Sequence, residues 1–298
     1  MRFMLQYPDA HGSEVDFLDA GRITDIAVAA ERAGWSGLAF TEHPAPSESW
    51  LNTGGHQSID PFVGLAAAAA VTTELRLLTF LTVVPYRNPM LLAKTAATLS
   101  MVSDGRFIMG AGAGYLKSEF FALGVDFEER NALLEESLEV LKLHWSGEAF
   151  SYEGRHFNAR NVIARPAPKG DIPIWMGGNS NAALRRAAKY ASGWMPMTGS
   201  AMVAATARTT TVDSVEAIAE RLGVLKEYAG DRYDSLDLVI SYNGEGLEEF
   251  DKDVERHRDG IGQLGELGAK WIIASPPWSP DPGPTEWLQR FAETFITS

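Results

Sequence analysis

The residues best suited to bind an anion are two glycines and two small polar residues in a row. The order is Gly177, Gly178, Asn179 and Ser180, and they lead directly into a stretch of helical periodicity, Asn181–Tyr190. Glycine lets a ligand approach the backbone closely, and the first N–H groups of a helix bind phosphate. The alternative is an ordinary strand-to-helix turn in which Asn179 or Ser180 caps the helix. These residues alone leave both interpretations open.

A candidate acid–base group is His43, one of six histidines in the chain. It directly follows the apolar run Gly37–Thr41, with Glu42 beside it and two prolines soon after it. An imidazole held rigidly near a carboxylate that tunes it is suited to general acid–base catalysis. A purely structural histidine is the alternative, and position alone does not decide between them.

A third feature is the run Gly110–Gly114, in which glycine alternates with alanine after an apolar segment. It does not fit the dinucleotide fingerprint, because the third glycine comes one position early and no acidic residue ends a strand about 20 positions on. A flat aromatic ligand lying against this strip, at Gly112, is more plausible than a nicotinamide site. A wide turn is the alternative.

Several kinds of site have no support in the sequence. The chain contains no cysteine, which excludes disulfides, thiolate metal sites and a cysteine nucleophile. There is no His-Glu-x-x-His motif, no metal-binding Asp-x-Asp loop and no Gly-x-Ser-x-Gly elbow. We therefore expect no metal and no serine hydrolase chemistry.

Charge and composition bear on partners and location. The chain has 26 Lys and Arg against 39 Asp and Glu, a net charge of −13. Such a charge repels nucleic acid and anionic lipid, so we expect neither as a partner. The segment Met1–Gly12 makes a poor signal peptide, and the longest apolar run, Pro61–Val71, is too short to cross a bilayer. With no cysteine to oxidise, the chain fits a reducing cytoplasm.

The elements that must position these residues are eight short apolar runs, each followed by a helical pattern. All-apolar strands alternating with helices favour a parallel sheet covered by helices. Eight units in 298 residues favour one closed (β/α)₈ TIM barrel over residues 1–298, with insertions, over an open doubly wound sheet. The predicted strands are Arg2–Tyr7, Gly37–Thr41, Leu75–Val84, Phe107–Ala111, Ile174–Met176, Gly193–Met195, Leu236–Ile240 and Trp271–Ala274.

In such a barrel the active site is built at the carboxyl ends of the strands, which is where all three candidate features fall. One segment, Gly147–Asp171, is rich in turn residues and is predicted to pack outside the barrel. Within it, Ala149–Tyr152 and His156–Asn158 are predicted to pair as a small hairpin. One helical stripe is predicted from Phe127 to Trp145, and another helix over Val212–Tyr228.

Seven stretches of the chain form a recognisable series. They are Val84–Lys94, Leu99–Tyr115, Glu119–Arg130, Trp145–Gly147, Tyr152–Phe157, Ile172–Ala188 and Gly193–Pro196. In this order they resemble the bacterial-luciferase-like flavin and deazaflavin oxidoreductases. The resemblance runs from Arg2 to about Pro196, and the last hundred residues match only in the alternation of strands and helices.

The resemblance implies a TIM barrel whose mouth holds the cofactor ring, with the cofactor phosphate beside the loops after strands 5 and 6. His43 then corresponds to the histidine at the ring. The bulge that buttresses the ring corresponds to Thr79 and Phe80, where the family often has a non-prolyl cis peptide. The residues implied to bind the phosphate are Gly177, Gly178, Asn179, Ser180 and Thr198.

At two positions the chain differs from the family's sugar-phosphate dehydrogenases, and both differences argue against that activity. Those deazaflavin-dependent enzymes have a carboxylate where this chain has Tyr115, and a lysine where it has Gly199–Ala201. The resemblance therefore implies an oxidoreductase that uses reduced deazaflavin F420 on another small, largely apolar organic substrate. The alternatives are an FMN-dependent monooxygenase that uses O₂ and externally supplied FMNH₂, and a barrel that binds flavin without turnover. A homodimer is also implied, through early helices such as the small-residue stretch Pro61–Ala70.

Overall fold

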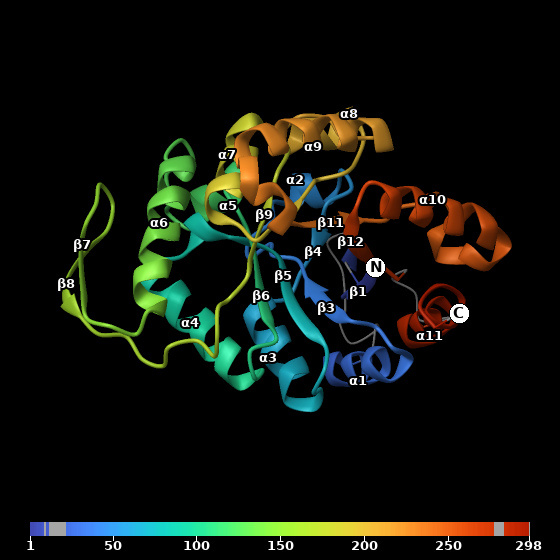
Figure 1. Ribbon diagram of the computed structural model, residues 1–298, viewed down its shortest axis with the longest axis horizontal. Coiled ribbons are helices and arrows are strands. Elements are labelled where there is room, and N and C mark those ends of the chain that lie inside the picture. Colours follow the sequence, from blue (N-terminus) through green and yellow to red (C-terminus); the bar gives the residue numbers. More distant parts are fainter. Residues whose placement is uncertain (9, 12–21, 277–282, 298) are drawn as a thin grey trace.

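Eight parallel strands close into a barrel in the computed structural model, which describes residues 1–8, 10–11, 22–276 and 283–297 (Figure 1). The strands follow one another around the ring in the order β1, β12, β11, β10, β9, β6, β5, β3, and back to β1. The predicted closed (β/α)₈ barrel and all eight predicted strands are confirmed. Their bounds are β1 Arg2–Gln6, β3 Gly37–Phe40, β5 Arg76–Val83, β6 Phe107–Gly112, β9 Ile174–Gly177, β10 Gly193–Met195, β11 Asp237–Ser241 and β12 Ala269–Ala274.

The strands are apolar along their whole length because both of their faces are covered. Outside, they pack against helices; Phe3 of β1, for example, packs edge to face against Phe291 of α11 (Pro284–Phe295) at 5.9 Å between ring centres. Inside, large side chains fill the barrel, so it is a packed core below its mouth. These inward residues are Met4, Ala39, Leu78, Ile108, Trp175, Met195, Val239, Trp271 and Ile273.

One long helix follows each strand and covers the barrel. Several of these helices begin with a residue type that commonly caps helices. Asp60 and Asn88 each cap a helix that starts with proline, and Ser180 caps α7 by accepting from the N–H of Ala183. Besides α11, these helices are α1 Ile23–Ala33, α3 Pro61–Val71, α4 Pro89–Val102, α6 Arg130–Trp145, α7 Asn181–Tyr190, α9 Val215–Ala229 and α10 Val254–Glu266. None of the helices in the described ranges is long and apolar enough to span a membrane.

Two predicted helix boundaries are wrong. Helix α6 begins at Arg130, and Phe127 instead packs with Phe120 at a ring distance of 5.2 Å, in a small cluster beside the barrel mouth. Helix α9 begins after its cap Ser214, because Val212 forms an isolated β-bridge with Gly199. In both cases an apolar residue that fits the helical period is used for a tertiary contact just before the helix.

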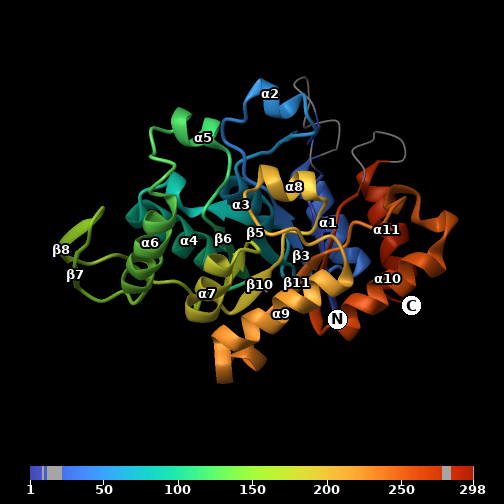
Figure 2. The same ribbon diagram turned by 90° about the horizontal axis from the view of Figure 1, so that it is seen from above.

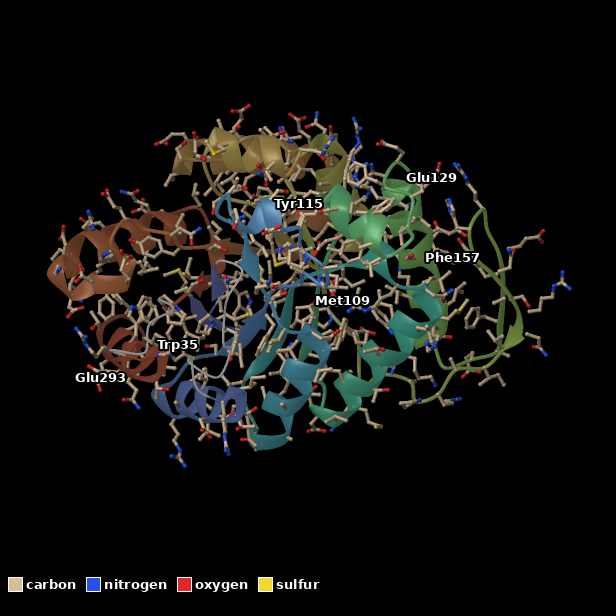
Figure 3. All side chains as sticks on the ribbon, turned by 180° about the vertical axis from the view of Figure 1, so that it is seen from behind. Trp35, Met109, Tyr115, Glu129, Phe157 and Glu293 are labelled. Carbon is tan, nitrogen blue, oxygen red and sulfur yellow. The ribbon has the colours of Figure 1, made fainter. Side chains whose placement is uncertain are left out.

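The segment after α6 forms the predicted hairpin, which lies outside α6 and away from the barrel (Figure 1). Its strands are β7 (Phe150–Glu153) and β8 (Asn158–Val162), so the second strand begins two residues later than predicted. The reason is Glu136 of α6, whose carboxylate accepts from the N–H groups of His156 and Phe157. These hydrogen bonds anchor the hairpin to α6, and Figure 3 shows Phe157 beside this helix.

Three short helices stand at the mouth end of the barrel, where they surround the candidate site (Figure 2). They are α2 (Glu48–Leu51), α5 (Lys117–Ala122) and α8 (Ala201–Thr206), inserted after β3, β6 and β10 respectively. A two-residue pairing of β2 (Ala10–His11) with β4 (His56–Gln57) joins the loop after β1 to the loop after β3. Insertions at the carboxyl ends of strands build the walls of a deep mouth.

Candidate functional site

A cavity of about 890 Å³ opens at the carboxyl ends of the strands. This volume is within the range of cofactor and small-molecule sites. Seven of the nine predicted site residues line it: His43, Phe80, Gly112, Gly177, Gly178, Ser180 and Thr198. The fold thus places residues as many as 155 positions apart in the sequence, from His43 to Thr198, around one cavity.

The floor of the cavity includes the predicted irregularity in β5. The register of β5 against β6 shifts between Thr79 and Thr82, and the peptide bond between Phe80 and Leu81 is cis. At this point the Leu81 side chain lies over two neighbouring strands. A Cβ on Gly177 would come within 2.2 Å of Leu81 Cδ2, and a Cβ on Gly112 within 2.7 Å of Leu81 Cδ1. The two glycines therefore make room for Leu81.

Thr79 and Asn179 are exceptions among the predicted contacts, because neither lines the cavity. Thr79 is fully buried, and its hydroxyl donates to the carbonyl of Gly110 at 3.0 Å. Asn179 is also fully buried. Its amide nitrogen donates to the carbonyls of Met197 and Thr210, each at 2.8 Å. The expectation of direct cofactor contact by these two side chains is corrected to positioning: Thr79 holds the β5 bulge to β6, and Asn179 joins two loops.

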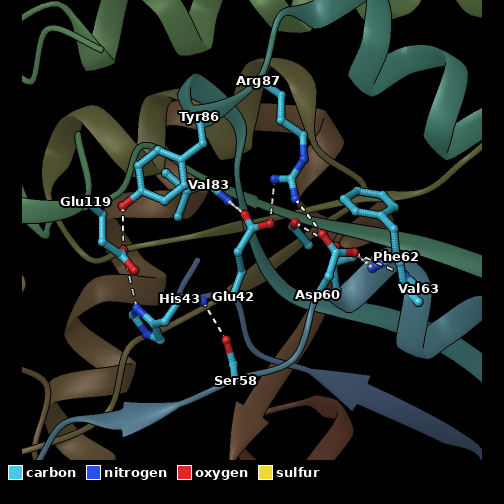
Figure 4. Close-up of polar contacts among 12 residues, drawn as sticks. Glu42, His43, Ser58, Asp60, Phe62, Val63, Val83, Tyr86, Arg87 and Glu119 are labelled. Carbon is cyan, nitrogen blue, oxygen red and sulfur yellow. Dashed lines mark hydrogen bonds and ion pairs between the residues drawn. The ribbon is translucent and has the colours of Figure 1, made fainter. Parts of the chain in front are cut away.

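His43 lies at the β3 side of the mouth and is held from several directions (Figure 4). Its backbone N–H donates to Ser58 Oγ at 2.6 Å. Its Nδ1 lies 3.4 Å from a carboxylate oxygen of Glu119, a residue of α5 that is only 1% exposed. The His43 ring also packs against Trp50 at 4.5 Å and, edge to face, against His56 at 4.8 Å. The imidazole therefore has a defined orientation.

The carboxylate next to His43 in sequence is not its partner, which corrects the expectation placed on Glu42. The Glu42 carboxylate accepts from the N–H of Val83 at 2.7 Å and forms an ion pair with Arg87 at 2.5 Å. Burial raises the pKa of Glu42, although the Arg87 charge and the Val83 N–H act in the opposite direction. Glu42 thus fixes the end of β5 to the β3 loop (Figure 4).

Three aromatic rings surround His43. Trp50 from α2, His56 from β4 and Tyr115 after β6 all lie within 6.2 Å of its ring, measured between ring centres. His56 and Tyr115 line the cavity together with His43. Sequence patterns did not indicate Trp50, His56 or Glu119, since each comes from a different loop and only the closed barrel places them together.

The opposite side of the mouth, formed by the loops after β9 and β10, suits an anion. Gly178 has φ of +103°, a left-handed conformation that glycine adopts easily, and it turns the chain into α7. Ser180 caps the helix through Ala183, and in the described chain no hydrogen bond uses the N–H groups of Asn181 and Ala182. Nearby, the Thr198 hydroxyl is buried and has no hydrogen-bond partner among the described residues.

Three arginines add positive charge to this side. Arg186 of α7, Arg130 at the start of α6 and Arg208 after α8 line the cavity. Arg130 and Arg208 share the ring of Phe127, at 3.8 and 5.2 Å from its centre. Burial lowers the pKa of the Arg130 guanidinium, and the charges of Arg208 and Arg186 lower it further. Guanidinium groups stay protonated in proteins, so the three like charges repel one another, and this repulsion is partly offset by Glu135 at Arg186 and Glu128 at Arg130.

The adjacent arginine, Arg185, faces away from the cavity and stacks on Tyr228 at 4.9 Å. Arg186 in contrast is 7% exposed and donates to Glu135 and Asn131. Of these two neighbouring arginines, Arg186 is the one in the cavity wall. Within the described ranges, no group of three His, Cys, Asp or Glu side chains is placed to hold a metal ion.

The two sides of the cavity face each other across the barrel. β10 lies four positions from β3 in either direction around the eight-stranded ring. A molecule spanning the mouth would therefore have one end among His43 and the rings and the other among the arginines and the start of α7. Leu81 and the inward core of the barrel lie beneath its middle.

Comparison with curated proteins gives relatives along most of the chain. An uncharacterized protein of Mycobacterium tuberculosis, Rv0940c, is 30% identical over 291 residues, covering 91% of this chain and 93% of its own. The F420-dependent glucose-6-phosphate dehydrogenase of Nakamurella multipartita is 30% identical over 238 residues, covering 78% of this chain and 65% of that protein.

Solved structures share the same fold at low sequence identity. The monooxygenase RslO1 from Streptomyces bottropensis superimposes with a TM-score of 0.79 at 20% identity, covering 99% of each chain. The oxygenating constituent of 3,6-diketocamphane monooxygenase from Pseudomonas putida, in complex with FMN, gives 0.70 at 15% identity, covering 99% of this chain and 97% of the other. The family model described as luciferase-like monooxygenase matches residues 1–241. The chain belongs to the luciferase-like monooxygenase family.

Proposed function

We propose that this protein is an oxidoreductase that uses the deazaflavin F420 on a small uncharged organic substrate. The observation that carries the proposal is the division of one cavity into two chemically different sides. His43 and its surrounding rings lie on one side, and three arginines with the start of α7 lie on the other. A cofactor with a flat ring at one end and a phosphate at the other matches this division.

The residues on the arginine side fit a phosphate. The Thr198 hydroxyl is buried without a partner in the described chain, and such a group costs free energy until a ligand bonds to it. The free N–H groups at the start of α7 favour negative charge, and an anion relieves the mutual repulsion of the arginines. Phosphate binding here is local, since a net charge of −13 gives no long-range attraction.

The arginines favour F420 over FMN. FMN ends in a single phosphate, whereas F420 continues beyond its phosphate into a tail with several carboxylates. The three guanidinium groups extend from the interior to the rim: Arg186 is 7% exposed, the Arg130 side chain is 19% exposed and Arg208 is exposed. That gradient suits a polyanionic tail leaving the cavity.

The His43 side supports an uncharged substrate. The Lys and Arg residues in the described cavity wall are the three arginines of the opposite side. The segments 12–21 and 277–282 contain no Lys or Arg, so they cannot supply a cation either. The charged group nearest to His43 is the carboxylate of Glu119. A sugar phosphate would meet this carboxylate with no cation to pair with, which agrees with Tyr115 and Gly199–Ala201 replacing the charged residues of sugar-phosphate dehydrogenases.

When bound, the deazaflavin supplies hydride transfer, and the protein orients the substrate and handles the proton. His43 is suited to donate a proton to a substrate oxygen or accept one from it, because its ring is fixed and it lines the cavity. His56 and Tyr115 provide an aromatic surface beside His43 on the cavity side, and Trp50 packs against the His43 ring.

A direct test is a fluorescence titration of the purified protein with F420 and, separately, with FMN. We expect F420 to bind at least tenfold more tightly than FMN, a difference of about 1.4 kcal/mol. The reverse order would favour the FMN-dependent monooxygenase, and no binding of either at millimolar concentration would contradict the proposal. Bound F420 that never changes its absorbance with a panel of neutral alcohols and ketones would favour the non-catalytic barrel.

A further inference from the structure

The carboxylate of Glu119 lies in a pocket of hydrogen-bond donors. Its two oxygens accept from the Tyr86 hydroxyl at 2.7 Å and from the N–H of Ala45 at 3.2 Å, and Nδ1 of His43 lies 3.4 Å from the oxygen that Tyr86 contacts (Figure 4). A carboxylate that is 1% exposed is stable only when such partners replace water. The Tyr86 hydroxyl and the Ala45 N–H both donate, which suits the ionised form, since a carboxylate accepts hydrogen bonds and donates none.

The surroundings of Glu119 are rigid. The neighbouring Phe120 is fully buried and packs edge to face against Tyr86 at 4.9 Å and Phe127 at 5.2 Å. Burial, and then the negative charge of Glu119, raise the pKa of the Tyr86 phenol far above neutral pH. Tyr86 therefore remains protonated and donates to Glu119 at neutral pH.

These contacts determine which nitrogen of His43 carries the proton in the neutral imidazole. One nitrogen of a neutral imidazole is a donor and the other an acceptor. Since Glu119 accepts, Nδ1 of His43 must be the donor, and Nε2 keeps its lone pair. A carboxylate that fixes a tautomer in this way sets the direction of proton transfer in other acid–base sites.

We propose that Glu119 is the positioning residue for His43: it holds the proton on Nδ1 and leaves Nε2 as the nitrogen that exchanges a proton with the substrate. The catalytic part of this inference rests on the proposed function, whereas the tautomer itself does not. The other titratable groups around His43 are His56 and Tyr115 on the cavity side and Tyr86 and Glu42 in the wall. Only Glu119 makes a hydrogen bond to the His43 ring in the described chain.

The test is to measure the tautomer of His43 by NMR in the full-length, ¹⁵N-labelled protein. Long-range ¹H–¹⁵N correlation spectra separate protonated from unprotonated ring nitrogens, and the signals missing in His43→Asn identify His43. We expect the Nδ1–H form of the neutral ring to predominate by about tenfold or more, as a charge-assisted hydrogen bond allows. In Glu119→Gln, where the amide must also satisfy Tyr86 and Ala45, we expect this preference to fall to about one to one.

Tyr86→Phe is the matched control. It removes a hydrogen bond from the same carboxylate oxygen but leaves the contact between Glu119 and His43, so the tautomer should stay as in the wild type. A wild-type tautomer in Glu119→Gln, or an equal change in Tyr86→Phe, would overturn the inference. Near-UV circular dichroism checks that both variants fold.

If Glu119→Gln does not fold, Glu119→Asp takes its place, since the shorter side chain withdraws the carboxylate from Nδ1. The Nδ1–H preference must then fall several-fold, and an unchanged preference overturns the inference. Titration of the wild type and Glu119→Gln with F420 separates the two claims. Failure of the wild type to bind F420 contradicts the proposed function, while the NMR result decides the tautomer by itself.

Discussion

His43 receives its hydrogen-bond partner from a residue 76 positions later in the chain. Its place at the mouth was predictable, because it directly follows an apolar strand of a parallel barrel. Its partner was not. Glu42 is the adjacent carboxylate, but successive side chains of an extended chain point to opposite sides, so Glu42 and His43 face different neighbours. Glu119 was within a stretch that resembles the family, yet nothing local connects it with His43.

At this scale the first prediction concerns His43→Ala. The ring is at the cavity surface, so its removal should leave the thermal unfolding midpoint within a few degrees of the wild type. Turnover of F420 with a neutral alcohol or ketone substrate should fall about 10²–10⁴-fold, the usual effect of one positioned acid–base group. Stopped-flow absorbance measures the rate, and unchanged turnover would assign His43 a structural role.

A second residue-scale prediction concerns Glu31, whose carboxylate accepts from the N–H groups of Thr73, Glu74 and Leu75. Burial acts to raise its pKa, but these hydrogen bonds outweigh it and lower the pKa. A lowered pKa contributes stability that is complete above the unfolded-state value of about 4.3 and is lost as pH falls below it. Urea unfolding should therefore show stability decreasing below about pH 4.3.

Glu31→Gln should reduce that acid dependence and lower the free energy of unfolding at pH 7 by about 1–3 kcal/mol. Glu74→Gln, at a neighbouring exposed position, is the control. An acid dependence that is identical in the wild type and Glu31→Gln would show that this carboxylate does not contribute.

At the scale of elements, the bulge in β5 requires small residues on the neighbouring strands β6 and β9. Leu81 projects over Gly112 and Gly177, and Gly177→Ala would place a methyl group 2.2 Å from Leu81 Cδ2. We expect Gly177→Ala to destabilise the protein by about 1–3 kcal/mol and to weaken binding of F420 and of its phosphate-free deazariboflavin analogue alike, because the ring floor is disturbed. In Gly177→Ala/Leu81→Ala the clash is gone, so the two changes should be strongly non-additive in a urea-unfolding double-mutant cycle. Additive effects would contradict this packing.

The same scale shows what sequence patterns could predict. Apolar runs identified all eight strands, because a strand buried on both faces is apolar throughout. Hydrophobic periodicity gave a wrong helix start where an apolar residue fits the helical spacing but makes a tertiary contact outside the helix. Phe127 is an example, since its ring packs against Arg130 and Arg208. The glycines at positions 112 and 177 were predicted at the cavity, but their role in accommodating Leu81 depends on a bulge that only the assembled sheet reveals.

For the molecule as a whole, the net charge of −13 and the cationic side of the cavity have separate consequences. The overall charge disfavours polyanionic partners, whereas the arginines provide a local exception for one small ligand.

The association of whole molecules is a further prediction. The exposed face of α3 contains Val63, Ala70 and Val71, and Leu91 of the adjacent α4 is 69% exposed. A helix with no charged residue on its exposed face favours burial against a second copy. We predict a homodimer through this face at micromolar concentration, and Val63→Glu should convert it to a monomer in light scattering. A monomeric wild type would contradict the prediction.

The most direct test of the claim that the α7 side of the cavity holds the cofactor phosphate is to substitute two neighbouring arginines, one at a time. Arg186 lines the cavity and Arg185 stacks on Tyr228 outside it, so Arg186→Gln and Arg185→Gln change the same charge in the same helix. Fluorescence titrations of the wild type and both variants with F420 and with the phosphate-free deazariboflavin analogue give six dissociation constants. We predict that Arg186→Gln weakens F420 binding about 10–100-fold, as loss of a charge-assisted hydrogen bond would, and leaves the analogue and Arg185→Gln near wild type. Equal weakening of both ligands by Arg186→Gln, or equal effects of the two substitutions on F420, would contradict the account.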